Sequence, residues 1–354
     1  MSRLYAFGSN GSGQLGIGTA EDTASPQKCL FQEDMDVPHT DMLLGQLLKI
    51  TAGGNLTLIL LRNGQVYSSG CIYDDGRGDM DTIYDPVHVF HKRFSDISKT
   101  KFCSALWEAS VLVTDDESIY SQGRGSRGEL GTKTDMRSIW QRVFTTPPPG
   151  TQVVDLSSGM AHTVVIFSNG EAYGWGNGRK GQLGEPAQIV ETPRKIEGLG
   201  FRVMRAVCGR EFTYFVGEDC HAVLGSDKWN VKCDIPSTVP DWINIGASFG
   251  SIFILKTDGN IISWGRNDHG QLAPPNLPEI KQIGIGSEHV VALTKAGAVL
   301  CWGWGEHGNC GTDTDDAGDV KNKWNEIRVE NEGGAEVVGV GAGWATSFVW
   351  VKTS

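Results

Sequence analysis

The chain has 354 residues, with 31 Lys or Arg and 42 Asp or Glu, so its formal net charge is −11. This acidic balance argues against direct binding of DNA or RNA, because clustered Lys and Arg residues supply much of the affinity for phosphates. No apolar run approaches the ~18 residues needed to cross a bilayer, so we expect no membrane-spanning helix.

Glycine is the outlier of the composition, with 47 residues, or about 13% of the chain, against a usual share of about 7%. These glycines mark an internal repeat. Its first half is an aromatic residue, a glycine and a Gly-Gln-Leu-Gly turn that begins five residues later; the clearest copies begin at Phe7, Trp175 and Trp264. The seven marker glycines, in chain order, are Gly8, Gly70, Gly123, Gly176, Gly225, Gly265 and Gly303.

The second half of the repeat is a short apolar strand, a turn and another apolar strand, and residues 153–166 show it best. We count seven copies, which surround Gly53, Ser104, Gly159, Gly209, Ala247, Gly286 and Gly343. A polar turn such as Asn169-Gly170 follows this half. Asx-Gly dipeptides between β-rich runs are hairpin signals, so we predict an antiparallel sheet in each repeat.

The spacing of the marker glycines predicts the architecture. They lie 62, 53, 53, 49, 40 and 38 residues apart, and about 50 residues per unit suits a four-stranded propeller blade. A helical turn is conceivable only over residues 41–48. Seven small sheets protect their edges by closing a ring. The chain starts in a first half-unit and ends in a second one, over residues 337–351. We therefore predict an all-β, single-domain, seven-bladed β-propeller over residues 1–354, closed by its N- and C-terminal strands in one blade.

The first eight residues have no secretion or transit-peptide character. The eight cysteines contain no Cys-x-x-Cys pair, so we interpret them as reduced, mostly buried thiols. These features predict a cytoplasmic protein and leave nuclear entry open.

The repeat resembles that of the regulator-of-chromosome-condensation family, whose unit is close to Tyr-x-Trp-Gly-x-Asn-x-x-Gly-Gln-Leu-Gly, and the likeness covers essentially the whole chain. A narrower resemblance is to the fungal alpha-tubulin-suppressor, or killer-toxin-insensitivity, propellers. It rests on residues 5–11, residues 301–311 and Gly286-Ser287-Glu288-His289.

The narrower resemblance implies a one-to-one heterodimer with a small electron-carrier protein that holds zinc or iron. It also implies support of diphthamide synthesis on elongation factor two and of Elongator-dependent modification of wobble uridine in tRNA, with contacts to those enzymes through the carrier. The metal would belong to the partner, and no cofactor is expected in this chain.

No set of nucleophile, base and orienting residues stands out from the positions that the repeat itself explains. We therefore predict that the protein is not an enzyme and has no catalytic residues. The best metal candidate is Cys301, His307 and Cys310, but zinc sites usually show closer pairs and a fourth ligand, and Cys310 occupies the leucine slot of the repeat. The acidic run 313–319 lacks two calcium ligands. We favour core packing for the cysteines and a solvated loop for the run.

His162 and His289 occupy one repeat position that carries Leu56, Phe212 or Thr346 in other copies, which favours a structural slot. The glycine-rich stretches 8–18 and 123–131 lack the Gly-Lys-Ser/Thr ending of phosphate loops.

Binding is the stronger hypothesis, because residues after the turn glycines differ from blade to blade whereas scaffold residues should look alike. Aromatic anchors with polar rims are typical of protein interfaces. We predict a partner-binding surface from two groups of residues. The first follows the turns and contains Trp107, Glu108, Arg210, Glu211, Phe249, Glu288 and Trp344; the second, in the last blade, contains Trp302, Trp304, Glu306 and His307.

The alternative is a purely structural role, in which the tryptophans pack between blades. For Trp175, Trp264 and Trp302 we favour that core position. Three functional classes remain: an interaction scaffold, which we favour; a nucleotide exchange factor for a Ran-like GTPase, for which this chain lacks a basic tail; and an enzyme active at the propeller mouth.

Overall fold

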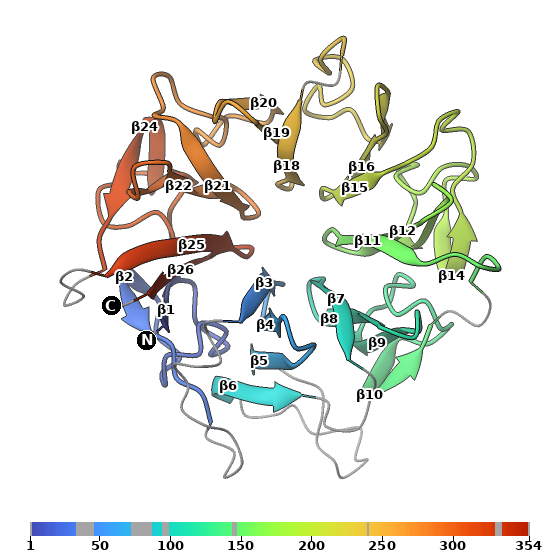
Figure 1. The fold of residues 1–354 in the computed structure, drawn as a ribbon, viewed down its shortest axis with the longest axis horizontal. Helices are drawn as coiled ribbons and strands as arrows, with labels where there is room; N and C mark the ends of the chain where they lie inside the picture. Colours follow the sequence, from blue (N-terminus) through green and yellow to red (C-terminus); the bar gives the residue numbers. More distant parts are fainter. Residues whose placement is uncertain are drawn as a thin grey trace.

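The computed structural model describes residues 2–32, 46–71, 87–93, 99–143, 147–238, 241–329 and 335–352. All 26 regular elements in these residues are β-strands, and none of the described residues forms a helix long and apolar enough to cross a membrane. The strands make seven small sheets that stand as blades around a central channel (Figure 1). The predicted seven-bladed β-propeller is therefore confirmed.

Each blade is an antiparallel sheet whose inner strand lies beside the channel. Blade 1 contains β25 (Glu336–Ala342), β26 (Thr346–Lys352), β1 (Ser2–Gly8) and β2 (Thr23–Lys28). Blade 2 contains β3 (Leu47–Ala52), β4 (Leu56–Leu61), β5 (Val66–Gly70) and β6 (Val87–Arg93). Blade 3 contains β7 (Thr100–Ala105), β8 (Ala109–Thr114), β9 (Ile119–Arg124) and β10 (Met136–Arg142).

The remaining blades follow in chain order. Blade 4 contains β11 (Val153–Ser158), β12 (His162–Phe167), β13 (Ala172–Asn177) and β14 (Ile189–Lys195). Blade 5 contains β15 (Arg205–Cys208), β16 (Phe212–Val216) and β17 (His221–Gly225). Blade 6 contains β18 (Trp242–Ala247), β19 (Ser251–Lys256) and β20 (Ile261–Gly265). Blade 7 contains β21 (Ile280–Ile285), β22 (His289–Thr294), β23 (Val299–Trp304) and β24 (Asp319–Ile327).

The two ends of the chain share blade 1, as the sequence predicts. β1 pairs with β26 in an unbroken antiparallel register that runs from Ser2 opposite Lys352 to Gly8 opposite Thr346. Figure 1 shows the two termini side by side at this blade. The ring is closed by backbone hydrogen bonds between the first and last segments of the sequence.

Blades 5 and 6 differ from the expected four strands, because each has three strands in the described residues. They are the blades whose marker glycines are followed by the two shortest spacings. After β20 the chain carries Pro274, Pro275 and Pro278. Proline has no backbone N–H to donate to a strand ladder, so this segment forms no outer strand. The possible helical turn over residues 41–48 lies mostly outside the described residues, and its last two positions begin β3.

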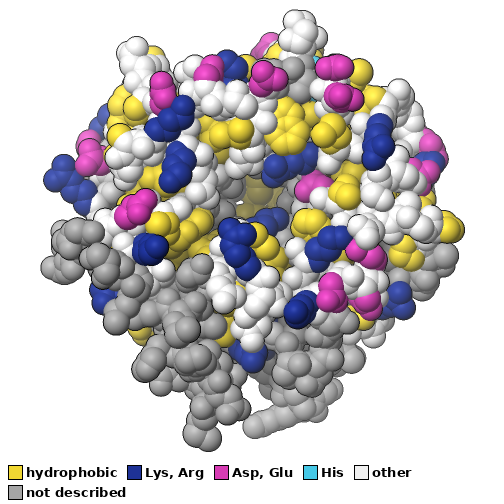
Figure 2. Space-filling view, viewed as in Figure 1, with side chains coloured by type: hydrophobic (Ala, Val, Ile, Leu, Met, Phe, Trp, Pro, Cys, Tyr) yellow, Lys and Arg dark blue, Asp and Glu magenta, His cyan; other side chains and the backbone are white. Residues whose placement is uncertain are grey.

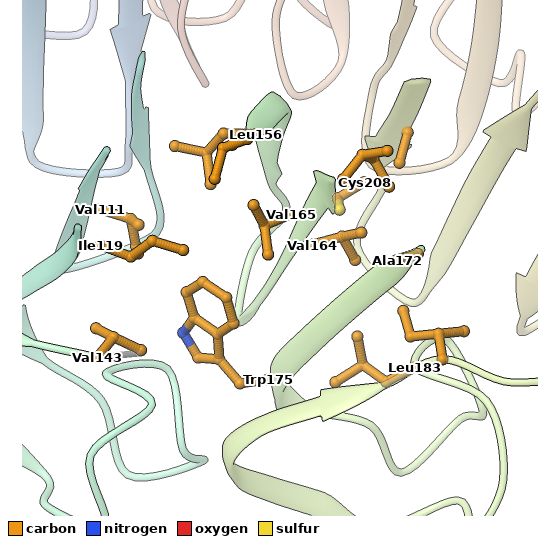
Figure 3. Packing of buried hydrophobic residues seen from close by; sticks show 14 of the residues in the cluster. Val111, Ile119, Val143, Leu156, Val164, Val165, Ala172, Trp175, Leu183 and Cys208 are labelled. Atoms are coloured by element: carbon orange, nitrogen blue, oxygen red, sulfur yellow. The ribbon is translucent and has the colours of Figure 1, made fainter. Parts of the chain in front are cut away.

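The core lies between neighbouring blades, and the repeat tryptophans bind it together. Trp175 is fully buried, and its indole N–H donates to the Glu129 carbonyl of blade 3 at 2.9 Å. Figure 3 shows its ring directed toward Val143 of the preceding blade, with Leu183 on the other side of β13. Trp264 and Trp302 donate in the same way to carbonyls of the preceding blade. The core position that we favoured for all three is confirmed.

The propeller has two ends, which we name by their inner-strand features. The turn face carries the turns that join the first two strands of each blade, at residues 53–55, 106–108, 159–161, 209–211, 248–250, 286–288 and 343–345. The opposite end, where each inner strand begins, we call the bulge face. Between them the seven inner strands line a cavity of about 420 Å³. Figure 2 looks into the hollow at the centre of the ring, where hydrophobic and Lys or Arg side chains gather.

Candidate interaction face

Backbone hydrogen bonds between neighbouring blades fix the positions of the turns. Each bond joins an N–H of one turn to a carbonyl of the next turn around the ring. They are Gly54 to Trp107 at 3.2 Å, Trp107 to Met160 at 3.3 Å, Arg210 to Phe249 at 3.1 Å, Phe249 to Ser287 at 2.8 Å, and Ser287 to Trp344 at 2.9 Å. The residues predicted from equivalent repeat positions are thus brought to one end of the propeller, around its axis.

Three aromatic side chains from non-adjacent blades meet over the axis on the turn face. The ring centroids of Trp107 and Trp344 lie 4.5 Å apart, and those of Phe249 and Trp344 lie 4.7 Å apart. Blade 2 separates Trp107 from Trp344, and blade 7 separates Trp344 from Phe249, so these contacts reach across the ring. We call these three residues the aromatic cluster. Arg210 extends it, with its guanidinium 6.0 Å from the Phe249 ring.

The aromatic cluster is rigidly held and yet partly open to solvent. Trp107 is 44% exposed, and the other two rings are half-buried. A large flat side chain that stays exposed on an ordered backbone loses little conformational freedom when it is covered. Trp, Tyr and Arg are the residues that most often dominate the binding energy of protein interfaces. The cluster therefore has the composition and the position of an interface anchor.

Two hollows flank the aromatic cluster. One has a volume of about 370 Å³ and lies around Trp107, Glu108, Arg124 and Met160. The other has a volume of about 360 Å³, and its lining includes Arg210, Glu211, Lys228, Trp229, Phe249 and Arg266. Glu108 and Glu211 are half-buried at the edges of these hollows. The turn face is thus an apolar centre with charged rims.

The sequence analysis missed Trp229 and Arg266, which belong to this surface. Trp229 is half-buried between two cations, with Lys228 at 5.0 Å and Arg266 at 4.8 Å from its ring centroid. It lies in the irregular segment after Gly225, in a blade whose repeat has decayed. An aromatic residue in a polar loop outside every repeat slot was the signal available in the sequence.

Two residues predicted for the surface are instead buried. Trp302 has no exposed area. Glu288 is 4% exposed, and its carboxylate accepts from Arg266 Nη1 at 2.5 Å and from Gln271 Nε2 at 2.8 Å. Burial raises the pKa of Glu288, and Gln271 and Arg266 oppose that rise. Glu288 joins blades 6 and 7 through these two bonds. Because Trp302 and Glu288 are both buried, we omit them from the interaction surface.

Trp304 and His307 of the second predicted group form their own cluster at the outer part of blade 7, with ring centroids 6.3 Å apart. Trp304 stacks on His269 with centroids 5.4 Å apart, and His269 Nδ1 lies 2.9 Å from Asp319 Oδ1. His307 pairs with Asp22 at 2.9 Å, and Glu306 is exposed. The backbone N–H of Trp304 donates to the Glu288 carbonyl at 2.9 Å, and this bond ties the cluster to the turn face.

Of the three candidate metal ligands, Cys301 and Cys310 lie within hydrogen-bonding reach of each other, but His307 does not join them. Cys301 and Cys310 are fully buried in the core of blade 7, whereas the ring of His307 is directed to Asp22. In the acidic run 313–319, Asp315 Oδ1 accepts the N–H groups of Ala317 and Asp319, which closes a tight turn. Across the described parts of the chain, no three His, Cys, Asp or Glu side chains are grouped to hold a metal ion.

His162 and His289 are structural, as expected, and each joins two blades. His162 Nε2 lies 3.0 Å from Thr213 Oγ1, and that hydroxyl donates to the Gln182 carbonyl at 2.9 Å. Because the hydroxyl has one proton, it must accept from a protonated Nε2, which leaves Nδ1 without a proton. His289 makes the same arrangement with Ser347 at 2.9 Å. Burial lowers the pKa of each imidazole to about 4.

Comparisons with known proteins agree with this geometry. A family model of the RCC1-like domain matches residues 3–349. The RCC1 repeat-containing protein C10F6.04 of Schizosaccharomyces pombe is 33% identical over 304 residues, which cover 79% of this chain and 81% of that protein.

Solved structures share the fold at lower identity. Prp20p of Saccharomyces cerevisiae superposes with a TM-score of 0.79 at 20% identity, covering 100% of this chain and 92% of that one. Human WBSCR16 superposes with a TM-score of 0.77 at 19% identity, covering 99% of this chain and 100% of that one. The match along the whole ring of blades shows that the chain belongs to the RCC1-like domain family.

Proposed function

We propose that this propeller is a non-catalytic interaction scaffold that binds a small zinc- or iron-carrying electron carrier, one-to-one, through its turn face. Through that carrier it would support diphthamide synthesis and Elongator-dependent modification of wobble uridine in tRNA. The aromatic cluster carries the interaction part of the proposal, because three rings from different blades converge on an exposed site that the backbone holds in place. The choice of carrier and pathway rests on the terminal motifs 5–11 and 301–311.

The physical role of the scaffold follows from the turn face. An aromatic centre surrounded by Arg210, Glu211, Lys228 and Arg266 excludes water from the middle of an interface and orients a partner by its charges. A carrier held in this way has its metal site at a fixed position relative to client enzymes. The propeller contributes binding and orientation, and the electron-carrying group stays with the partner.

The first test is the identity of the partner. Full-length tagged protein is purified from its source cells, and the proteins that accompany it in stoichiometric amounts are identified by mass spectrometry. We expect a small metal protein at a one-to-one ratio. Recovery of a large enzyme alone, or of no stoichiometric protein, would contradict the proposal.

The second test is the substitution Trp107→Ala on the turn face. We expect the affinity for the carrier to fall at least about 30-fold, because a central interface tryptophan contributes ~2 kcal/mol or more. Isothermal titration calorimetry with the purified partner measures the change. Val154→Ala is the matched control: Val154 is also 44% exposed, but it lies on the bulge face. Equal affinities of the two variants would remove the turn face from the interaction.

A nucleotide exchange factor for a Ran-like GTPase is the second candidate, suggested by the fold that this chain shares with Prp20p. The structural work on Prp20p describes its binding to Gsp1p and histones. At 20% identity this likeness carries the fold alone. Release of labelled GDP from a purified Ran-like GTPase separates the two functions: a scaffold leaves the release rate unchanged, whereas an exchange factor accelerates it by orders of magnitude.

A further inference from the structure

The inner strands share a feature on the bulge face, opposite the turn face. Six of the seven contain a β-bulge near their first residue, where the register with the second strand shifts by one position. In the seventh, the N–H of Met204 donates at 2.8 Å to Val216 O, although Val216 already pairs with Arg205. The residues at this position, from blade 1 to blade 7, are Val338, Leu48, Lys101, Val154, Met204, Ile243 and Lys281.

A bulge re-aims one side chain away from the alternating pattern of its strand. Here it turns bulky apolar side chains to solvent. Leu48 is 48% exposed, Val154 44%, Met204 49% and Ile243 50%. Among the described residues, only Leu30 and Trp107 are large hydrophobic residues of comparable exposure. Most of the large hydrophobic residues exposed on the described surface therefore occupy one repeat position on one face.

Three of these residues are neighbours around the ring. Val154, Met204 and Ile243 belong to the consecutive blades 4, 5 and 6, and we call them the apolar arc. The same position carries a lysine in the blade on each side, Lys101 in blade 3 and Lys281 in blade 7. Contiguous exposed apolar surface with a polar border is the usual mark of a protein interaction site.

The charged residues at the channel mouth beside the apolar arc are mainly positive, although the whole chain has a net charge of −11 and the same face carries the exposed carboxylates of Glu218, Asp219 and Asp241. The channel that opens here is lined by Lys49, Arg205 and Asp155 as its charged residues. Lys101 is paired with Glu117 at 2.8 Å, so its charge is balanced. With Lys281 on the rim, three cations face one carboxylate. A partner segment of negative charge fits this mouth better than a neutral or basic one.

We propose that the bulge face is a second docking surface, which binds an acidic segment of a partner protein that carries bulky apolar side chains. The apolar side chains cover the apolar arc, and the carboxylates face Lys281, Arg205 and Lys49 at the channel mouth. This surface is separate from the turn face, so one propeller can hold two partners at once. The proposal does not depend on the identity of the carrier bound at the turn face.

The test begins with short random peptides displayed on phage. They are selected on the full-length protein and counter-selected on a triple variant, Val154→Ser with Met204→Ser and Ile243→Ser. We expect the enriched peptides to combine a net negative charge with two or more bulky apolar residues. Enrichment of neutral or basic peptides, or no enrichment over the triple variant, would overturn the proposal.

One enriched peptide is then synthesised with a fluorescent label, and its binding is measured by fluorescence anisotropy. We expect the triple variant to bind at least about tenfold more weakly. Because its three substitutions are at exposed positions, its unfolding midpoint should stay at the wild-type value. Lys281→Glu tests the charge without changing the apolar arc and should weaken binding about threefold or more. Trp107→Ala should bind the peptide as wild type does, and a loss in that variant instead would place the peptide on the turn face.

Discussion

Substitution of Gly176 by alanine is expected to lower the free energy of unfolding by roughly 3 kcal/mol or more. All seven marker glycines have φ between 100° and 122°, a region that residues with a side chain rarely adopt. At Gly176, with φ of 102°, an added Cβ would also lie 2.4 Å from the Ala161 carbonyl oxygen and 2.8 Å from His162 Cα. These are backbone atoms of the turn before β12 and of its first residue, so no side-chain rotation relieves the contact.

Two further glycines separate the causes of this loss. Gly198 has φ of 83°, but an added Cβ meets nothing within 4 Å, so Gly198→Ala should cost only the backbone strain of ~1–2 kcal/mol. Gly11 has neither a positive φ nor a close neighbour, and Gly11→Ala should be nearly neutral. Urea unfolding followed by tryptophan fluorescence ranks the three variants. If Gly176→Ala lost no more stability than Gly198→Ala, the close approach between β12 and β13 would have no energetic role.

The regular parts of the fold could be predicted because a marker glycine recurs in every blade and a Gly-Gln-Leu-Gly-like turn follows it in most of them. The marker glycine ends or nearly ends the third strand, where its Cβ would strike the turn that precedes the second strand. The leucine of this turn fills a buried slot at Leu15, Leu130 and Leu183, and Cys310 fills the same slot in blade 7 with no exposed area, whereas Leu272 of blade 6 is half-buried. The glutamine side chain folds back within its turn, as in the acceptance of the Lys180 N–H by Gln182 Oε1 at 2.9 Å.

The interaction surface could be predicted only in part, because exposure is decided by neighbouring blades. Glu288 and Trp107 occur near equivalent turns, yet Arg266 and Gln271 of blade 6 enclose Glu288 whereas Trp107 stays open. The sequence also placed Trp344 near the axis without showing that its ring reaches Trp107 across blade 2. Contacts between non-adjacent blades depend on the diameter of the closed ring, which no local pattern encodes.

The bulge face could not be predicted at all, for a related reason. In an ideal strand, alternate residues point to opposite sides, so Val154 and Ile243 read as ordinary strand residues. One inserted residue shifts the register of the inner strand and directs these side chains to solvent. The sequence contains no glycine or proline at these positions to mark the shift.

The pH dependence of stability should show the two buried histidines. In the folded protein, burial lowers the pKa of His162 and His289 to about 4, whereas an unfolded chain has histidines near 6.5. Between these values the unfolded state binds protons that the folded state refuses, so the free energy of unfolding falls as the pH falls from about 6.5 to about 4. We expect each histidine to contribute a loss of about 3 kcal/mol over this range. Above pH 7 both residues are neutral in both states, and their contribution is constant.

The structure shows why the buried imidazole of His162 stays neutral in the folded protein. His162 Nε2 already donates to Thr213 Oγ1, and Nδ1 is one of the buried atoms without a hydrogen-bond partner among the described residues. Protonation would place an uncompensated charge and an unpaired donor between two blades. Leucine occupies the same slot at Leu56, so His162→Leu keeps the core filled and removes the titrating group.

Urea unfolding of wild type and of His162→Leu, measured at several pH values from 7.5 to 4.5, tests this prediction. The carboxylates common to both proteins cancel in the difference between their free energies of unfolding. His162→Leu should be less stable than wild type at pH 7.5, because the Thr213 hydroxyl loses its donor. As the pH falls, the difference between the two free energies of unfolding should narrow with the slope of one bound proton, about 1.4 kcal/mol per pH unit. His289→Leu should behave in the same way, and the double variant should lose both slopes. A gap that stays constant from pH 7.5 to 4.5 would mean that these imidazoles accept protons in the folded ring as readily as in the unfolded chain.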